Sequence, residues 1–139
     1  MIVHKLAVDR DLNKERRSLV SEAAAAQIEK VNSLLIDARK YHTTTERNEE
    51  VEQAIKMALQ DIAESVGALR EFVKDGAVVK RAQGAVKSLR IAITGRHFED
   101  EHDGQLRDPH VILETIALES LRTKRALLAL QHVQYRQSH

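Results

Sequence analysis

The chain has 139 residues, a length typical of a single domain that buries its own core without disulfides or metals. Cysteine is absent, which excludes a disulfide framework, a thiolate metal site and a cysteine nucleophile. Lys and Arg total 22 against 21 Asp and Glu, and the formal net charge of +1 excludes a strongly polyanion-seeking protein on bulk charge alone.

Hydrophobic residues make up 42% of the chain but aromatic residues only 3%, with one proline and five glycines. A core of Leu, Ile, Val and Ala is typical of helix bundles. The first residues carry charges too early for a signal peptide, and no apolar run approaches the roughly 18 residues of a membrane span. We therefore expect one all-α domain over residues 1–139, in the cytoplasm and outside the membrane.

Apolar periodicity predicts four helices, over about 11–41, 45–74, 77–94 and 108–137. In the first, apolar residues recur alternately every four and three positions and form one stripe. These residues are Ala24, Ile28, Val31, Leu35 and Ala38. Two helices of roughly 30 residues would each be about 45 Å long. We therefore expect an elongated up-down four-helix bundle with coiled-coil-like packing.

Two further helices repeat this pattern at near-heptad spacing. In the second helix the apolar positions are Val51, Ile55, Ala58, Ile62, Leu69 and Phe72. In the third they are Val79, Ala82, Val86, Leu89 and Ile93. Each set forms one stripe, which predicts that each helix buries one face.

Capping signals predict where these helices begin and end. The run TTTE from Thr43 to Glu46 matches a capping box, so we expect the second helix to start there. Gly76 is expected to end that helix in a left-handed conformation, and Gly95 lies at the end of the third helix. Asp108 followed by Pro109 supplies an N-cap and a first helical residue for the fourth.

The predicted fourth helix carries more apolar residues than one buried stripe requires. Its main apolar arc covers about half of the helical wheel. The arc consists of Ile112, Leu113, Ile116, Ala117, Leu121, Leu127, Leu128 and Leu130. Val111, Leu118 and Ala129 form a second strip outside this arc, and Lys124 lies inside it, as at the rim of an interface. The helix is therefore either central in the monomer or carries a self-association surface, with these four residues as interface candidates.

The segment 77–96 contains five basic residues and no acidic one. Lys80, Lys87 and Arg90 lie on one ridge of the predicted third helix, with Arg81 nearby, so a phosphate backbone could follow this ridge. The alternative is that this basic helix pairs with the acidic second helix. Aromatic residues that could stack on bases are missing from the segment.

The polar stretch from His97 to Asp108 is expected to be a loop. Glu99 with His102, and His110 with Glu114, have the spacing of metal ligands on a helix. A divalent metal held by these four residues is one alternative, and a solvated acidic loop is the other. The remaining helices offer no comparable Glu or His pairs, so we expect no metal site and no cofactor.

Arg96 and His102 are separated by five residues, which resembles the Arg-x4-6-His motif of the HEPN family of small helical ribonucleases. The resemblance implies metal-independent RNA cleavage, with Arg96 holding phosphate and His102 moving a proton near the attacked ribose hydroxyl. The intervening acids, Glu99 to Glu101, would repel RNA phosphate. Arg125 and His132 also have the required spacing.

These patterns favour a non-catalytic helical protein that acts by protein–protein contact, as a homo-oligomer or as a subunit of a larger assembly. An apolar face of the fourth helix is the expected interface. The alternative is a nucleic-acid-binding protein that uses Lys80, Arg81, Lys87 and Arg90, with HEPN-like cleavage at Arg96 and His102 as its enzymatic extension.

Overall fold

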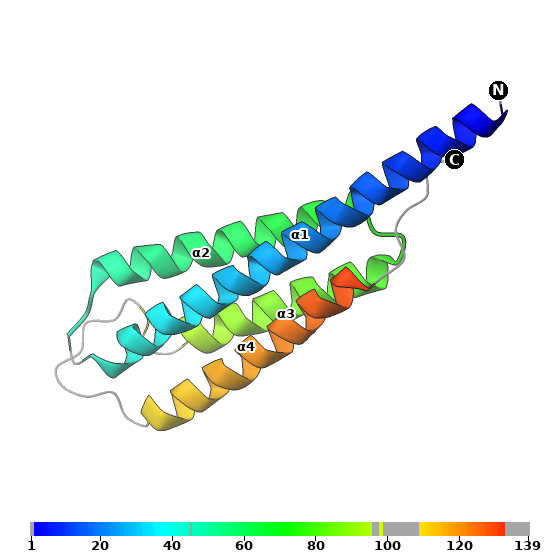
Figure 1. The fold of residues 1–139 in the computed structure, drawn as a ribbon. Helices are drawn as coiled ribbons and strands as arrows, with labels where there is room; N and C mark the ends of the chain where they lie inside the picture. Colours follow the sequence, from blue (N-terminus) through cyan, green and yellow to red (C-terminus); the bar gives the residue numbers. More distant parts are fainter. Residues whose placement is uncertain (1, 45, 96–97, 99–108, 133–139) are drawn as a thin grey trace.

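The protein is described by a computed structural model that covers residues 2–44, 46–95, 98 and 109–132. In these residues four α-helices follow one another: α1 (Ile2–Thr43), α2 (Glu49–Ala68), α3 (Gly76–Thr94) and α4 (Pro109–Gln131). A short 3-10 helix, η1 (Leu69–Glu71), directly follows α2. The helices pack side by side as an elongated bundle, which confirms the predicted all-α fold (Figure 1).

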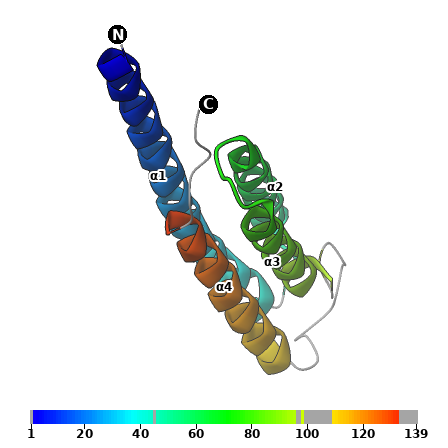
Figure 2. The same ribbon diagram turned by 90° about the vertical axis from the view of Figure 1, so that its right-hand side faces the viewer.

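Each helix packs mainly against two others. α1 and α3 both contact α2 and α4, so the helices form a ring in chain order. Figure 2 shows α4 running along α1, with the N-terminal part of α1 extending past the ends of the other helices. α4 therefore occupies a corner of the bundle and not a central position.

The core is built from the aliphatic stripes that the periodicity predicts. All five predicted positions of α3 are buried, from Val79 to Ile93. In α1 the residues Ala24, Val31 and Ala38 are buried, whereas Ile28 and Leu35 are partly buried and border the core. Because the stripe is wider than the contact area, its margins reach the surface of the bundle.

Helix α1 begins at Ile2, well before the expected start near residue 11. The segment 2–10 contains neither glycine nor proline, so nothing in it interrupts a helix that continues into the bundle. In the described residues, no helix combines the length and the apolar character that crossing a membrane would require.

The predicted capping box at Thr43–Glu46 is wrong. Thr43 Oγ1 donates to the carbonyl of Arg39 at 2.8 Å, so this threonine satisfies the end of α1 and not the start of α2. The N-cap of α2 is Asn48, whose side-chain oxygen accepts from the amide of Val51 at 3.1 Å. Asn48 fills the N-cap role because Asn is a preferred residue there.

The prediction for Gly76 is also wrong. The chain leaves α2 through η1, and Gly76 is the first residue of α3, with Asp75 as N-cap accepting from the amide of Ala77 at 3.0 Å. Asp competes well for an N-cap position, and glycine at the next position starts the helix without strain. The predicted ends at Gly95 and Pro109 are confirmed, since Gly95 is the C-cap of α3 and Pro109 begins α4.

The predicted N-cap Asp108 and the expected continuation of the fourth helix to residue 137 lie outside the described residues, which end at His132. Most of the predicted loop from His97 to Asp108 lies outside them as well. Phe98 is the one residue of that loop that the structure describes, and its ring lies 5.0 Å from the ring of Tyr41.

Candidate functional site

Large exposed aliphatic residues gather on α4. Four of them project from this helix: Val111 (48% exposed), Leu118 (48%), Leu121 (43%) and Leu128 (45%). By contrast, the described parts of α2 and α3 each expose one large apolar residue, Met57 and Ile91 respectively. Clustered exposed apolar residues mark interaction surfaces more often than single ones do.

Leu121 and Leu128 lie on the side of α4 that faces α1. Lys124 Nζ donates to Asn32 Oδ1 at 3.1 Å, and Gln131 Nε2 donates to the carbonyl of Ser21 at 3.2 Å. Residues three apart share a helix face, so each leucine is next to one of these two contacts with α1. The predicted assignment of both leucines to the buried arc is therefore wrong. The predicted arc is wider than the surface that α1 covers, so the leucines at its margin are exposed to solvent.

Ile36 extends this apolar surface onto α1. It lies one turn after Asn32, and its side chain is 68% exposed. Because the contacts 32–124 and 21–131 run in opposite directions along the two helices, Ile36 lies near the level of Leu121. We name Ile36, Leu121 and Leu128 the apolar edge of α1 and α4.

A groove of about 450 Å³ runs along the other side of α4, against α3. Small residues from both helices line much of it: Gly84, Ala85, Ala126 and Ala129. Thr123, which is fully buried, lies between the two helices: its Oγ1 is 2.7 Å from the carbonyl of Glu119 in α4 and 3.2 Å from that of Ala85 in α3, so its one proton is shared between them. The predicted interface residue Ala129 thus lines this groove, whereas Lys124 lies at the boundary with α1.

Three arginines line the same groove: Arg81 from α3, and Arg122 and Arg125 from α4. Arg122 Nη1 lies 3.0 Å from the carboxylate of Glu119, which also lines the groove. Within the described residues, no carboxylate forms an ion pair with Arg81 or Arg125. The groove therefore carries an excess of positive charge over a lining that is largely small and apolar.

The predicted basic ridge on α3 is exposed to solvent. Lys80, Arg81, Lys87 and Arg90 all project outward, and in the described part of the chain none of the four forms an ion pair. Acids of α2 pair elsewhere, since Asp61 contacts Lys30 of α1. The expected alternative, in which this helix pairs with the acidic second helix, therefore finds no ion pair to support it among the described residues.

Arg90 also lines a second hollow, of about 600 Å³, between α2 and α3. Leu59 and Phe98 form apolar parts of its lining, and Lys56, Gln60 and Thr94 contribute polar groups. A cation from each of the two helices therefore faces this hollow.

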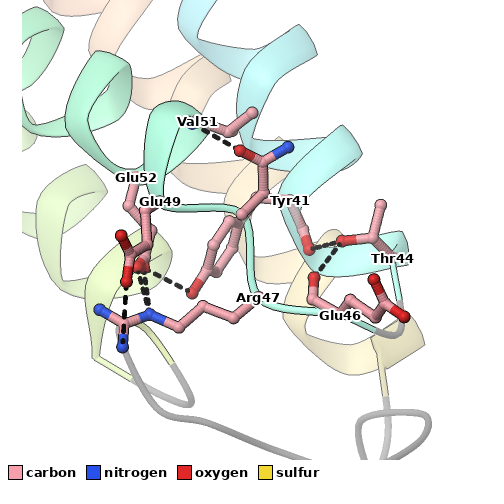
Figure 3. Close-up of polar contacts among 8 residues, drawn as sticks. Tyr41, Thr44, Glu46, Arg47, Glu49, Val51 and Glu52 are labelled. Atoms are coloured by element: carbon pink, nitrogen blue, oxygen red, sulfur yellow. Dashed lines mark hydrogen bonds and ion pairs between the residues drawn. The ribbon is translucent and has the colours of Figure 1, made fainter.

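A buried polar cluster joins α1 to α2 at one end of the bundle (Figure 3). The carboxylate of Glu52 accepts from Arg47 Nε at 2.7 and 3.0 Å, and the Tyr41 hydroxyl donates to the same carboxylate at 3.4 Å. The neighbouring His42 is buried and its Nε2 donates to the carbonyl of Ile93 in α3 at 2.9 Å, since a carbonyl oxygen can only accept. These contacts tie three helices together.

This cluster favours the protonated, positively charged form of Arg47. The hydrogen bond to the Glu52 carboxylate raises the pKa of Arg47 above its ordinary value. A raised pKa stabilises the folded state below the ordinary arginine pKa, and the stabilisation is lost only at still more alkaline pH. The ion pair therefore keeps its cation throughout the neutral and moderately alkaline range, as expected of a structural contact.

The predicted catalytic and metal residues are only partly described. Arg96, Glu99 and His102 lie outside the described residues. His110 and Glu114 do meet, with Nε2 and Oε1 3.0 Å apart, but both side chains are exposed. Within the described residues, no three His, Cys, Asp or Glu side chains are grouped as a metal site would need. The pair Arg125 and His132 is exposed as well.

Sequence reasoning did not single out the apolar edge, the arginine groove or the buried cluster as sites. A helical wheel places Leu121 and Leu128 in the apolar arc of α4 but does not show whether a neighbouring helix buries them. Ile36 lies outside the regular apolar stripe of α1. In the sequence nothing distinguishes the buried Glu52 from the neighbouring exposed acids Glu49 and Glu50 of the same helix. Comparison of the chain with known proteins finds no matching family model, no similar curated protein and no similar solved structure.

Proposed function

We propose that this protein is a non-catalytic assembly subunit that self-associates through the outer surface of α4. The observation that carries the proposal is the apolar edge, where Leu121 and Leu128 are about half exposed next to α1, and Ile36 of α1 is exposed near the level of Leu121. Their position next to two contacts with α1 means that this surface is built from two rigidly joined helices. Rigid apolar surfaces lose little conformational entropy on association.

The energetics favour association at this edge. Completing the burial of a half-exposed leucine contributes roughly 1 kcal/mol, and a two-fold symmetric contact counts each residue twice. Lys124, which lies between the two leucines, is held by Asn32, so its ammonium group already has a partner beside the contact. Val111 and Leu118 are also exposed on α4, but Leu118 lies one turn before Arg122 and so belongs to the groove side of the helix, outside this contact.

The self-association is tested with the double variant Leu121→Glu/Leu128→Glu. We expect the wild-type chain to form a defined oligomer in light scattering after size exclusion, and the variant to be a folded monomer, because four like charges would meet across a two-fold axis. Met57→Glu/Ile91→Glu is the matched control, since both residues are exposed and lie on α2 and α3. A wild-type monomer, or equal dissociation in both variants, would refute the proposal.

A second candidate function is nucleic-acid binding along α3. Its supporting observation is that Lys80, Lys87 and Arg90 are exposed and take part in no ion pair within the described residues. Binding of a single-stranded RNA should weaken steeply with salt and should fall further in Lys87→Glu/Arg90→Glu. No detectable binding at low salt would eliminate this function.

A further inference from the structure

We infer that the groove between α3 and α4 is a docking site for an acidic, partly apolar helical segment of another protein. This inference concerns the side of α4 that faces α3, whereas the apolar edge faces α1, and so it goes beyond self-association.

The shape of the groove suits a helix. Glycine and alanine at four lining positions allow a partner backbone to come close, as Gly84 shows: a Cβ added there would have no neighbour within 4 Å. Along α4 the lining extends from Glu119 to Ala129, which corresponds to about 15 Å, or almost three helical turns. Leu118, half exposed and preceding this stretch, offers an apolar contact at its end. Amphipathic helices dock in grooves of this kind.

The charge of the groove determines the character of the occupant. Arg81 faces the groove from one wall, and Arg122 and Arg125 face it from the other. Glu119 already engages Arg122, whereas Arg81 and Arg125 have no carboxylate partner in the described part of the chain. Guanidinium groups bind carboxylates through two parallel hydrogen bonds, so acidic residues on the flanks of a docked helix would complement both walls.

A second copy of this chain is the wrong occupant for this groove. A two-fold contact places the same surface on both sides, so the arginines of one copy would face those of the other. Like charges placed together across an interface oppose binding. At the apolar edge the ammonium group of Lys124 is held by Asn32 and Arg125 lies at the boundary with the groove, so a two-fold contact there brings apolar side chains together first.

A nucleic acid also fits the groove less well than a polypeptide. Its arginines and Ser88 could donate to phosphates, but its lining contains no aromatic residue on which a base could stack, and Glu119 would repel a phosphate. The small residues of the lining match the apolar stripe of an amphipathic helix, while the arginines match its acidic flanks. RNA binding at this groove is therefore an outcome that the experiment must separate from peptide binding.

The test uses the full chain and a fluorescein-labelled helical peptide of about five turns, with a leucine stripe flanked by glutamates. Fluorescence polarisation is measured at low and high salt. We expect Arg81→Glu/Arg125→Glu to weaken peptide binding by at least about tenfold. Lys80→Glu/Lys87→Glu is the matched control: it changes net charge equally and alters exposed residues that do not line the groove. Binding by the control should stay within about threefold of wild type.

Several results would overturn the inference. These are absence of peptide binding at low salt, equal weakening in both charge-reversal variants, and tighter binding of a single-stranded RNA that the arginine variant abolishes. Thermal unfolding by circular dichroism shows whether each variant is folded. Leu121→Glu/Leu128→Glu should still bind the peptide, so loss of self-association and loss of docking are read from different variants.

Discussion

The two sides of α4 differ in chemistry although they belong to one continuous helix. Towards α1 the helix exposes Leu121 and Leu128, and Ile36 adds to the same apolar edge. Towards α3 it presents Arg122 and Arg125 above a lining of alanines, and α3 adds Arg81 and Gly84. An apolar edge suits a second copy of the chain, and a cationic groove repels one.

This difference shows that the exposed chemistry of a helix face depends on the neighbouring helix. Both sides of α4 carry residues that a helical wheel would place at the margin of the apolar arc. On one side Asn32 of α1 accepts a hydrogen bond from Lys124, and Leu121 and Leu128 next to it stay half exposed. On the other side α3 contributes the small residues Gly84 and Ala85 and the cation Arg81, so a groove forms between the two helices. Three variants, ordered by their expected effect on the free energy of unfolding, test this contrast.

The largest change in stability is expected far from α4, for Glu52→Gln. The substitution removes the buried carboxylate that accepts from Arg47 and Tyr41, and should lower the free energy of unfolding by about 1–2 kcal/mol. Neither side of α4 should change, so oligomer mass and peptide binding should match wild type well below the melting temperature. The control is Glu49→Gln, whose exposed carboxylate lies 4.0 Å from Arg47 and should contribute less than about 0.5 kcal/mol. Equal loss in both variants, by urea unfolding, would contradict a structural role for the cluster.

A smaller effect of opposite sign is expected for Gly84→Ala. Alanine favours a helix over glycine by about 0.5–1 kcal/mol, and the added methyl group meets no atom within 4 Å, so the free energy of unfolding should rise. The same methyl group projects into the groove and should weaken binding of the acidic peptide several-fold. Urea unfolding and fluorescence polarisation measure the two effects. If stability and peptide binding rise together, the groove does not accept a closely packed helix.

The smallest change in stability is expected for Lys124→Met, which sharpens the definition of the apolar edge. Met is unbranched like Lys and one atom shorter, and it loses the hydrogen bond to Asn32, so the free energy of unfolding should change by less than about 1 kcal/mol. Self-association should tighten a few-fold, because apolar surface replaces an ammonium group between Leu121 and Leu128. Analytical ultracentrifugation measures the dissociation constant. Weaker association would place the contact elsewhere on α4.

The buried stripe of α3 could be predicted in full, but those of α1 and α2 only in part, since Leu34, Leu59 and Val66 are buried and were not among the predicted positions. The helix ends on either side of α2 could not be predicted. The five apolar positions of α3 are all buried, because one stripe on a straight helix points in one direction whatever its neighbours are. The start of α2 was predicted five residues from its observed N-cap, because Thr43, Thr44 and Asn48 all suit local capping. The threonine hydroxyls serve the end of α1, and that choice depends on where the preceding helix stops.

The candidate sites were predicted in outline only. The excess of apolar residues on α4 indicated a surface beyond the core, and Val111 and Leu118 are indeed exposed. Leu121, Leu128 and Ile36 were not distinguished from core residues or isolated surface residues, since only the register of α1 against α4 brings them together. Arg81 lies 41 residues before Arg122 and 44 before Arg125, so no local spacing relates it to these two arginines of α4.

The sequence by itself determined that the chain is helical, where its aliphatic stripes lie and which helix carries surplus apolar surface, because these properties follow from side-chain periodicity within single segments. Tertiary structure alone decided which side of α4 meets α1 and which meets α3. It also decided that Glu52 is buried against Arg47, and that Arg81 faces Arg122 and Arg125 across a groove. Those arrangements depend on contacts between distant segments, and their geometry is set by how the helices pack and not by any one helix.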